Sequence, residues 1–219
     1  DHSYTLMHAL WARGTVDLLR GNVEGALPAL QRGLVVGRVA NIPLLFPFVA
    51  APLGAACSLG GRPDEGIALL EESVERAAEM RLLAGHPQRL TWLGQARLSR
   101  GEGEAAARLA VQALELAEQL GERGHHAHAL RLLAEVEATR NPPDAERAAE
   151  TYRQVMDVAA GLEMRPLLAH SRLGLGRLLG LSGHRDEAEA HITAAGSLYA
   201  EMQAPGWIEA VAAVRRSLG

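Results

Sequence analysis

Cysteine and excess basic charge are what this sequence has least of. Its single cysteine, Cys57, cannot form an internal disulfide bond and suits a reducing compartment. Lys and Arg number 22 against 26 Asp and Glu, a formal net charge of −4 that argues against general affinity for nucleic acid or anionic membranes. No apolar run approaches the roughly 18 to 20 residues that span a bilayer, and no signal peptide opens the chain. These absences predict a soluble, cytoplasmic protein without nucleic-acid or membrane partners.

Glycine, in contrast, marks a regular series of turns. Gly21, Gly61 and Gly101 follow one another at intervals of forty residues, Asn141 holds the same register, and Gly183 follows after forty-two. Internal similarity at a period of about 20 to 50 residues is typical of a solenoid or another repeat array. Because 48% of the residues are hydrophobic, the chain can bury a sizeable core, and we expect the whole of it to form one solenoid domain.

Apolar residues between these turns recur at helical spacing, so each turn joins two amphipathic helices. The pattern predicts an all-α fold of five helix-turn-helix repeats, with a last helix that caps the array. Pro47 and Pro52 predict that the third helix starts late or kinks, because a Pro inside a helix costs about 3 kcal/mol. The turn at residues 141–144 is two residues longer than its counterparts. The expected helices are 4–20 with 23–39, 44–59 with 64–81, 87–100 with 104–120, 125–139 with 144–161, 166–181 with 185–202, and the cap 206–218.

Small residues return at two fixed offsets from each turn, one in the helix before it and one in the helix after it. A Gly inside a helix costs about 1 kcal/mol relative to Ala, so its return needs a compensating reason, which a close crossing of the two helices supplies. We therefore expect the two columns to face each other, and a third column of mostly larger residues to fill the space between pairs. The columns are Gly14, Gly54, Gly94, Ala134 and Gly176; Ala26, Gly66, Ala106, Ala148 and Ala188; and Leu30, Leu70, Ala110, Tyr152 and Ile192.

With these columns the sequence resembles the tetratricopeptide-repeat (TPR) family, whose motif is a small residue after Leu, a Gly turn, an Ala and a bulky residue. The motif occurs here at Leu53-Gly54…Gly61, at Leu93-Gly94…Gly101…Ala106, and at Leu175-Gly176…Gly183…Ala188…Ile192. The resemblance covers nearly the whole chain and implies a right-handed superhelix. The period of about 40 exceeds the typical 34 residues, so each pair should have longer helices or linkers.

The longer period and helix ends such as GLEMRP and YAEMQAPGW are similar to the C-terminal repeat regions of large bacterial signalling proteins. In those proteins an ATPase module and a nucleotide-cyclase or DNA-binding output domain precede the repeats. The likeness implies a regulatory, non-catalytic role. Since the first repeat begins almost at once, we expect residues 1–219 to be a fragment of a larger protein.

The candidate catalytic and metal-binding residues each have a simpler structural explanation. His125, His126 and His128 form the densest group of candidate metal ligands, but no Cys or acidic partner is arranged nearby in the sequence, so a surface role is favoured. Cys57 lies among Ala and Leu and is interpreted as a small buried residue. The Gly-rich turns lack the strand and the Lys-Ser/Thr of a phosphate-binding loop. We expect no enzyme activity, no metal and no cofactor.

Polar, aromatic and basic residues recur on the first helix of each pair, at positions that an ordinary core would keep apolar. The TPR resemblance implies that first helices line the concave surface, where these residues would form a groove for a peptide, a protein or other domains of the parent chain. The alternative is a small-molecule sensor, for instance of a sugar, which a closed pocket lined by Trp11 or Trp92 would favour. An uncovered terminal pair with Leu6, Leu10 and Trp11 also predicts a homodimer. The groove residues are His8, Trp11, Gln88, Thr91, Gln95, His128, Arg131, Glu135, His170 and Arg177.

Overall fold

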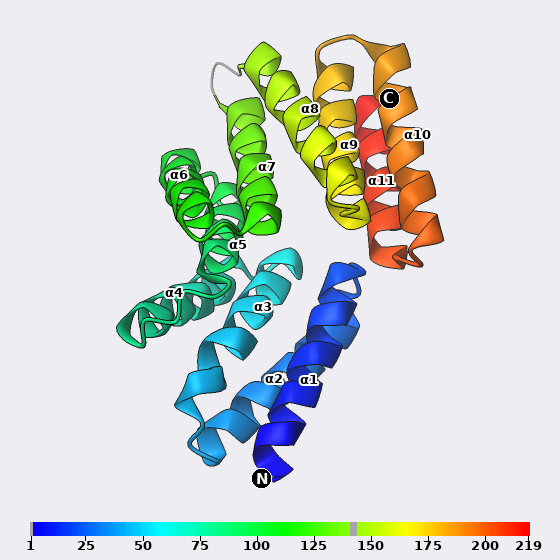
Figure 1. Cartoon of the computed structure of the whole chain (residues 1–219). Coiled ribbons are helices and arrows are strands. Elements are labelled where there is room, and N and C mark those ends of the chain that lie inside the picture. Colours follow the sequence, from blue (N-terminus) through cyan, green and yellow to red (C-terminus); the bar gives the residue numbers. More distant parts are fainter. Residues whose placement is uncertain (1, 141–143) are drawn as a thin grey trace.

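The computed structural model describes residues 2–140 and 144–219, and within these ranges it contains eleven α-helices and no strand (Figure 1). The all-α solenoid of five helix pairs and a capping helix is therefore confirmed. The predicted extra residues of the fourth turn, 141–143, lie outside the described residues. The helices are α1 (His2–Leu19), α2 (Val23–Val39), α3 (Phe46–Leu59), α4 (Pro63–Glu79), α5 (His86–Ser99), α6 (Gly103–Gln119), α7 (Arg123–Thr139), α8 (Ala145–Gly161), α9 (Arg165–Leu181), α10 (Arg185–Glu201) and α11 (Pro205–Leu218).

The turns repeat at twice the frequency that the glycine spacing indicates. Residues with positive φ follow the helices at intervals of twenty, both within pairs and between them: Gly21, Asn41, Gly61, Arg81, Gly101 and Gly121, then Glu163, Gly183 and Gln203. After α3, for example, the amide of Gly61 donates to the Ser58 carbonyl (3.2 Å) and the amide of Arg62 to the Cys57 carbonyl (2.9 Å). This is the Schellman arrangement that ends a helix on a left-handed residue. Four of these nine turns escape a search for glycine, because Asn41, Arg81, Glu163 and Gln203 adopt that conformation there.

The prolines of the second pair delay its first helix. Pro43–Leu45 forms a 3₁₀ turn, and α3 begins at Phe46 with Pro47 in its first turn, where the missing N–H is least harmful. Pro52 lies inside α3, which continues through it to Leu59. The predicted late start is confirmed.

The two columns of small residues face each other where the helices of a pair cross. A Cβ placed on Gly54 would lie 2.7 Å from the carbonyl oxygen of Gly66, and one on Gly176 would lie 3.0 Å from that of Ala188. The first distance is too short for a real Cβ, and the second is tighter than most Cβ contacts. Gly14 similarly lies against the Ala26 carbonyl. A small residue is therefore needed in this column because backbone approaches backbone at the crossing, as predicted.

In the third pair, the side chain that packs against the glycine of the crossing comes from the next pair. The bulky-column residue of the third pair is Ala110, and the space that a larger side chain would take is filled by Leu132 from α7 of the next pair. A Cβ on Gly94 would lie 2.4 Å from the Cδ2 of Leu132. The other members of this column, Leu30, Leu70, Tyr152 and Ile192, are all buried, as expected.

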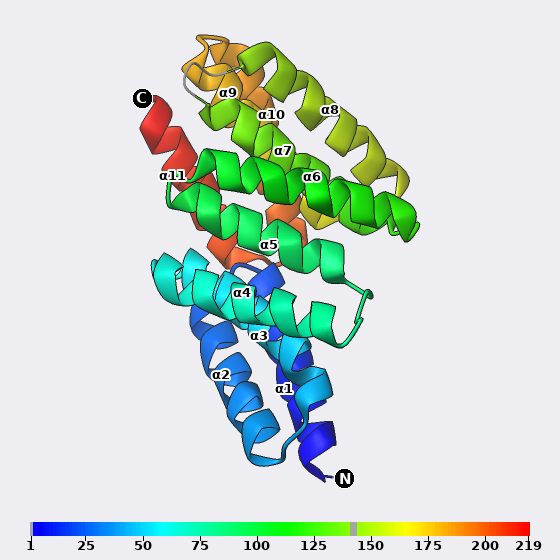
Figure 2. The same ribbon diagram turned by 90° about the vertical axis from the view of Figure 1, so that its left-hand side faces the viewer.

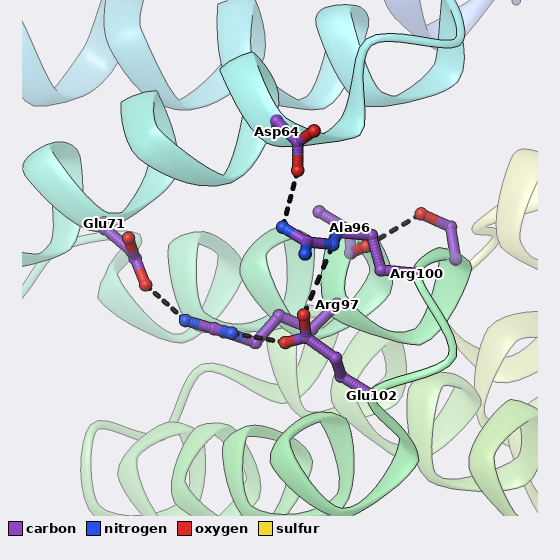
Figure 3. A network of polar contacts seen from close by, with 7 residues as sticks. Asp64, Glu71, Ala96, Arg97, Arg100 and Glu102 are labelled. Carbon is purple, nitrogen blue, oxygen red and sulfur yellow. Dashed lines mark hydrogen bonds and ion pairs between the residues drawn. The ribbon is translucent and has the colours of Figure 1, made fainter.

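Ion pairs tie the second pair to the third on the exposed side of the α4–α5 contact (Figure 3). Arg97 pairs with Glu71 of α4 and with Glu102, which follows α5. Arg100 bonds Asp64 at the start of α4 at 2.6 Å and Glu102 at 3.3 Å. Exposed pairs of this kind contribute about 0–1 kcal/mol each, so they orient neighbouring pairs more than they stabilise them.

The array curves until its two ends meet. Figure 1 shows the start of α11 beside the end of α1, and Figure 2 shows α4 and α6 on the outer side with α11 behind them. Second helices therefore form the outside, while first helices and the cap turn inward. In the part of the chain that the structure describes, no helix is both long enough and apolar enough to cross a membrane.

We expect Gly54→Ala to destabilise the protein by about 1–3 kcal/mol, because overpacking against a backbone carbonyl cannot be relieved by a side-chain rotation. Chemical denaturation measures the change in the free energy of unfolding. Gly161→Ala, at the end of α8, is the matched control because a Cβ there meets nothing within 4 Å. Equal stability of Gly54→Ala and wild type would contradict the crossing.

Candidate functional site

The closed array surrounds a cavity of about 760 Å³. Its walls come from first helices, from the turns before α7 and α9, and from the cap. Its apolar surface includes Leu18, Leu19, Ala55, Leu59, Trp92, Ala96, Met164 and Trp207. Its polar surface includes Thr15, Ser58, Gln88, Gln95, Ser99, Glu122, Arg123, His125, His128, Arg131, Glu135 and His170.

Helices α5 and α7 supply most of the polar wall. On α5 the lining residues Gln88, Trp92 and Gln95 are spaced by four and three positions, and on α7 His128 and Arg131 continue to Glu135 in the same way. This spacing places them on one face of each helix. The two faces offer amide, carboxylate, guanidinium, imidazole and indole groups to a single space.

The cap helix closes the cavity against the first pair. The indole Nε1 of Trp207 donates to the backbone carbonyl of Leu19 at 2.9 Å, across 188 positions of sequence. Beside it, the backbone of Gly206 packs so closely on Gly21 that a Cβ on Gly206 would lie 2.1 Å from the Gly21 oxygen. Trp207 thus both lines the cavity and joins its two ends. We call this contact the clasp.

Arg131 and Glu135 form an ion pair one helical turn apart at one end of the cavity. The Arg131 side chain is 14% exposed and that of Glu135 is 26% exposed. Arg131 donates to Glu135 through Nη1, while its Nε is buried without a hydrogen-bond partner among the described residues. A buried donor without a partner is costly, so this guanidinium is only partly satisfied.

Two imidazoles beside Arg131 stay uncharged. Burial, with Arg131 and His125 nearby, lowers the pKa of His128 from 6.5 to about 3. Burial, with Arg131 and His128 nearby, also lowers the pKa of His170 well below its usual value. The Nδ1 of the neutral His170 ring is hydrogen-bonded to the hydroxyl of Tyr199 at 2.6 Å. Its ring also meets Trp207 edge-on at 4.6 Å, which connects this end of the cavity to the clasp.

A second polar group lies about 12 Å further along α7, at the eight-residue distance from Arg131 to Arg123. There the Glu122 carboxylate contacts the His125 imidazole at 2.9 Å and accepts from the backbone amide of Gly85 at 3.4 Å. Burial lowers the pKa of the nearby Arg89 to about 10, although Glu122 opposes that shift. The cavity therefore has one polar group around Arg131 and Glu135 and another around Glu122 and His125.

The structure brings six of the ten predicted groove residues around this cavity and places four elsewhere. Gln88, Gln95, His128, Arg131, Glu135 and His170 line it. The six come from α5, α7 and α9, so the inward orientation of the first helices is as expected. Their role in binding remains a prediction.

The other four predicted residues are not among those that line the cavity. His8 and Trp11 stack along α1 toward Phe48 of α3, with centroid distances of 5.9 Å and 5.4 Å between successive rings. Thr91 is buried, and its hydroxyl donates to the Pro87 carbonyl at 2.9 Å. Arg177 is exposed on the later part of α9. The proposed row of equivalent positions therefore needs correction at these points.

The superhelical twist explains the correction. The cavity touches the last residues of α1 and α3, the length of α5, the first two thirds of α7 and the early part of α9. Successive pairs are rotated, so the axis of the cavity crosses each first helix at a different height. A repeat register aligns positions along the chain but does not include this rotation.

Several lining residues were missed by the repeat register. Trp92 lies one position after the predicted Thr91, and its spacing of four from Gln88 could have identified it. Trp207 and Met164 lie outside the first helices of the pairs, and nothing in the repeat pattern signals them. Trp92 lines a pocket that is about half open, and Trp11 does not line it, so the small-molecule alternative stays a prediction.

Neither the histidines nor the cysteine form a reactive site. No group of three or more His, Cys, Asp or Glu among the described residues is arranged to hold a metal ion. Cys57 is fully buried in the hydrophobic core of the first two helix pairs, as predicted. Burial raises the pKa of its thiol to about 11. The thiol therefore stays protonated at neutral pH and is a poor nucleophile.

Similarity to known proteins is confined to three-dimensional structure. No protein-family model matches the sequence, and no curated protein matches it. A putative kinesin light chain of Podosopora anserina with nearly identical TPR-like repeats superposes with a TM-score of 0.57 at 22% identity, over 93% of this chain and 98% of that one. BtubC from P. vanneervenii gives 0.60 at 18% identity, over 87% and 78% of the two chains.

A Rap protein complexed with Competence and Sporulation Factor superposes over the whole of this chain and 65% of its own, with a TM-score of 0.69 at 13% identity. These identities establish the fold and nothing finer. The chain thus has the fold of a TPR-like helical solenoid.

We expect the stability of the protein to fall as the pH is lowered from 6.5 toward 3. His128 and His170 are held neutral in the fold, so below pH 6.5 the unfolded chain takes up protons that the folded chain does not. Each contributes a slope of at most about 1.4 kcal/mol per pH unit. Denaturant unfolding at several pH values measures this slope for wild type and for His128→Gln. The difference between the two slopes is the contribution of the His128 proton. Identical slopes would contradict a neutral buried His128.

Replacing Gly206 by Ala should separate the clasp, because the new Cβ would meet the backbone oxygen of Gly21. The expected result is a loss of about 1–3 kcal/mol and faster amide exchange at the end of α1 and the start of α11. The matched control is Gly196→Ala in α10, where the nearest atom is at an ordinary 3.7 Å. Unchanged exchange at both helix ends would show that the clasp does not hold the array closed.

Proposed function

We propose that this chain is a non-catalytic binding module that takes a short peptide segment into its central cavity. The observation that carries this proposal is the closure of the array around a cavity of about 760 Å³ with both aromatic and polar walls. Cavities of about 300–1,000 Å³ bury most of a compact ligand.

The chemistry of the walls supports a peptide. Gln88 and Gln95 each offer an amide that can donate to and accept from a peptide backbone, and both lie on one face of α5. Trp92 and Trp207 offer large rigid surfaces for apolar side chains, with few rotatable bonds to immobilise. Binding at such a site combines apolar contact with a few directed polar bonds.

The structural comparison is compatible with this proposal. The Rap protein that superposes over this whole chain is complexed with Competence and Sporulation Factor. A fold shared at 13% identity does not transfer a ligand, but it supports TPR-like arrays of this shape as binders of a partner. We further propose that the module acts as the sensor or scaffold region of a bacterial signalling regulator, where a segment of the parent chain could also be the occupant.

A homodimer remains part of the proposal, although the predicted surface is smaller than expected. Leu6, Leu10 and Trp11 are half-buried, and Trp11 packs on Phe48. Val39 of α2 is 84% exposed, the largest exposure among the large hydrophobic side chains described.

The second candidate is a small-molecule sensor, for example of a sugar. It is favoured by the two indoles on the cavity wall, since flat aromatic faces and nearby amides suit a ring that carries hydroxyl groups. Its size also lies within the usual range for such sites. The same binding experiment separates the two candidates.

The test is native mass spectrometry of the protein mixed with a pool of random pentapeptides, and separately with a pool of mono- and disaccharides. We expect one peptide per chain to bind, and Trp92→Ala and Gln95→Ala to weaken binding at least tenfold. Val35→Ala on the outer face of α2 is the control and should bind like wild type. Binding from the sugar pool alone would favour the second candidate. Binding from neither pool, or binding that both cavity variants leave unchanged, would overturn the cavity as the site.

A further inference from the structure

The Arg131 end of the cavity has a cation whose hydrogen-bonding capacity is incompletely used. Arg131 donates through one nitrogen, Nη1, to Glu135, and its Nε has no partner among the described residues. Thr15, on the α1 wall of the same cavity, likewise has a buried hydroxyl without a partner in the described part of the chain. Buried polar groups are nearly always satisfied in folded proteins, so each exception needs an explanation.

The His and Tyr side chains around the Arg131 guanidinium are uncharged. His128 of α7 and His170 of α9 are uncharged because burial lowers the pKa of both. Burial also raises the pKa of the hydroxyls of Tyr152 on α8 and Tyr199 on α10, so both stay protonated. These groups can donate or accept hydrogen bonds but carry no charge.

The remaining charges are acidic Glu135 and basic Arg177. Glu135 is more exposed than Arg131, 26% against 14%, and lies on the cavity wall as well. Arg177 is exposed and is not a lining residue. Glu135 therefore balances the charge of Arg131, while the edge of the guanidinium that carries Nε has no acceptor among the described residues. Guanidinium groups bind planar carboxylates through two parallel hydrogen bonds.

We propose that the Arg131 end of the cavity binds a carboxylate of the ligand. The inference rests on the proposed function, since it requires that the cavity be a binding site. The apolar part of the ligand would lie toward Trp207, whose ring packs on His170 beside this end. The carboxylate can come from the end or an acidic side chain of a peptide, or from a small organic acid; the shared chemistry is an acid group attached to an apolar body.

The proposal makes opposite predictions for the two members of the ion pair. Glu135→Gln removes a negative charge next to the bound carboxylate and should tighten binding of an acid several-fold. The double variant Arg131→Met with Glu135→Gln removes both charges without leaving either one unpaired, and should abolish any preference for an acid. Arg131→Met alone is a poor test, because the Glu135 carboxylate that it leaves on the cavity wall would repel an acid whether or not Arg131 binds one. In Glu135→Gln the amide oxygen can still accept a hydrogen bond from Arg131.

Isothermal titration with indole-3-propionate and its neutral analogue indole-3-propionamide measures the preference, and an acetylated pentapeptide pool with free or amidated C-termini repeats it for peptides. In wild type we expect the acid to bind at least tenfold more tightly than the amide. A preference in the small probe alone identifies a small acid as the source of the carboxylate, and one in the peptide pool identifies a peptide. The affinity of the acid should stay constant from pH 6 to 8, because His128 and His170 stay neutral over that range.

Three results would overturn the carboxylate site: equal binding of acid and amide, no binding of any acid probe, or a Glu135→Gln variant that binds the acid no more tightly. If acid and amide bind equally and Trp92→Ala weakens both, the cavity remains a binding site and only the carboxylate assignment fails. Circular dichroism melting checks that the double variant folds. If it does not, Glu135→Gln decides the question alone.

Discussion

The close crossing of two helices within each pair is the constraint on which the rest of this structure depends. At Gly54 the first helix lies so near the second that a Cβ would not fit against the facing backbone carbonyl, and at Gly176 the same approach is only slightly wider. The crossing sets how each pair is shaped, and five similar pairs joined by similar turns then generate a uniform curve. The central cavity exists because that curve continues until the last helix reaches the first.

The fold could be predicted from the sequence because the same residue types recur at the same positions of each repeat. The positions of Gly14, Gly54, Gly94 and Gly176 give the crossing, and the ends of most helices follow within two residues from glycine and proline. The turns at Arg81, Glu163 and Gln203 carried no such signal, since their left-handed conformation is imposed by the helices on either side. Their helices were found from hydrophobic spacing instead.

The site was predictable only in its middle. Helices α5 and α7 cross the centre of the array, where equivalent positions such as Gln95 and Glu135 both face inward. Toward the ends, rotation between pairs moves His8 and Arg177 past the cavity. That rotation accumulates from small packing differences that no single residue encodes. The contribution of Trp207 depends on the closure of the whole array, which is a property of all the repeats together.

The clasp between Trp207 and Leu19 also changes how the chain can fold. A linear repeat array has only contacts between neighbours, so it can nucleate in any repeat and fray freely from either end. A bond across 188 positions can form only after every intervening pair has stacked with the correct rotation. Both ends of the array are then protected by the same contact. Closure thus gives a modular chain some of the all-or-none cooperativity of a globular domain.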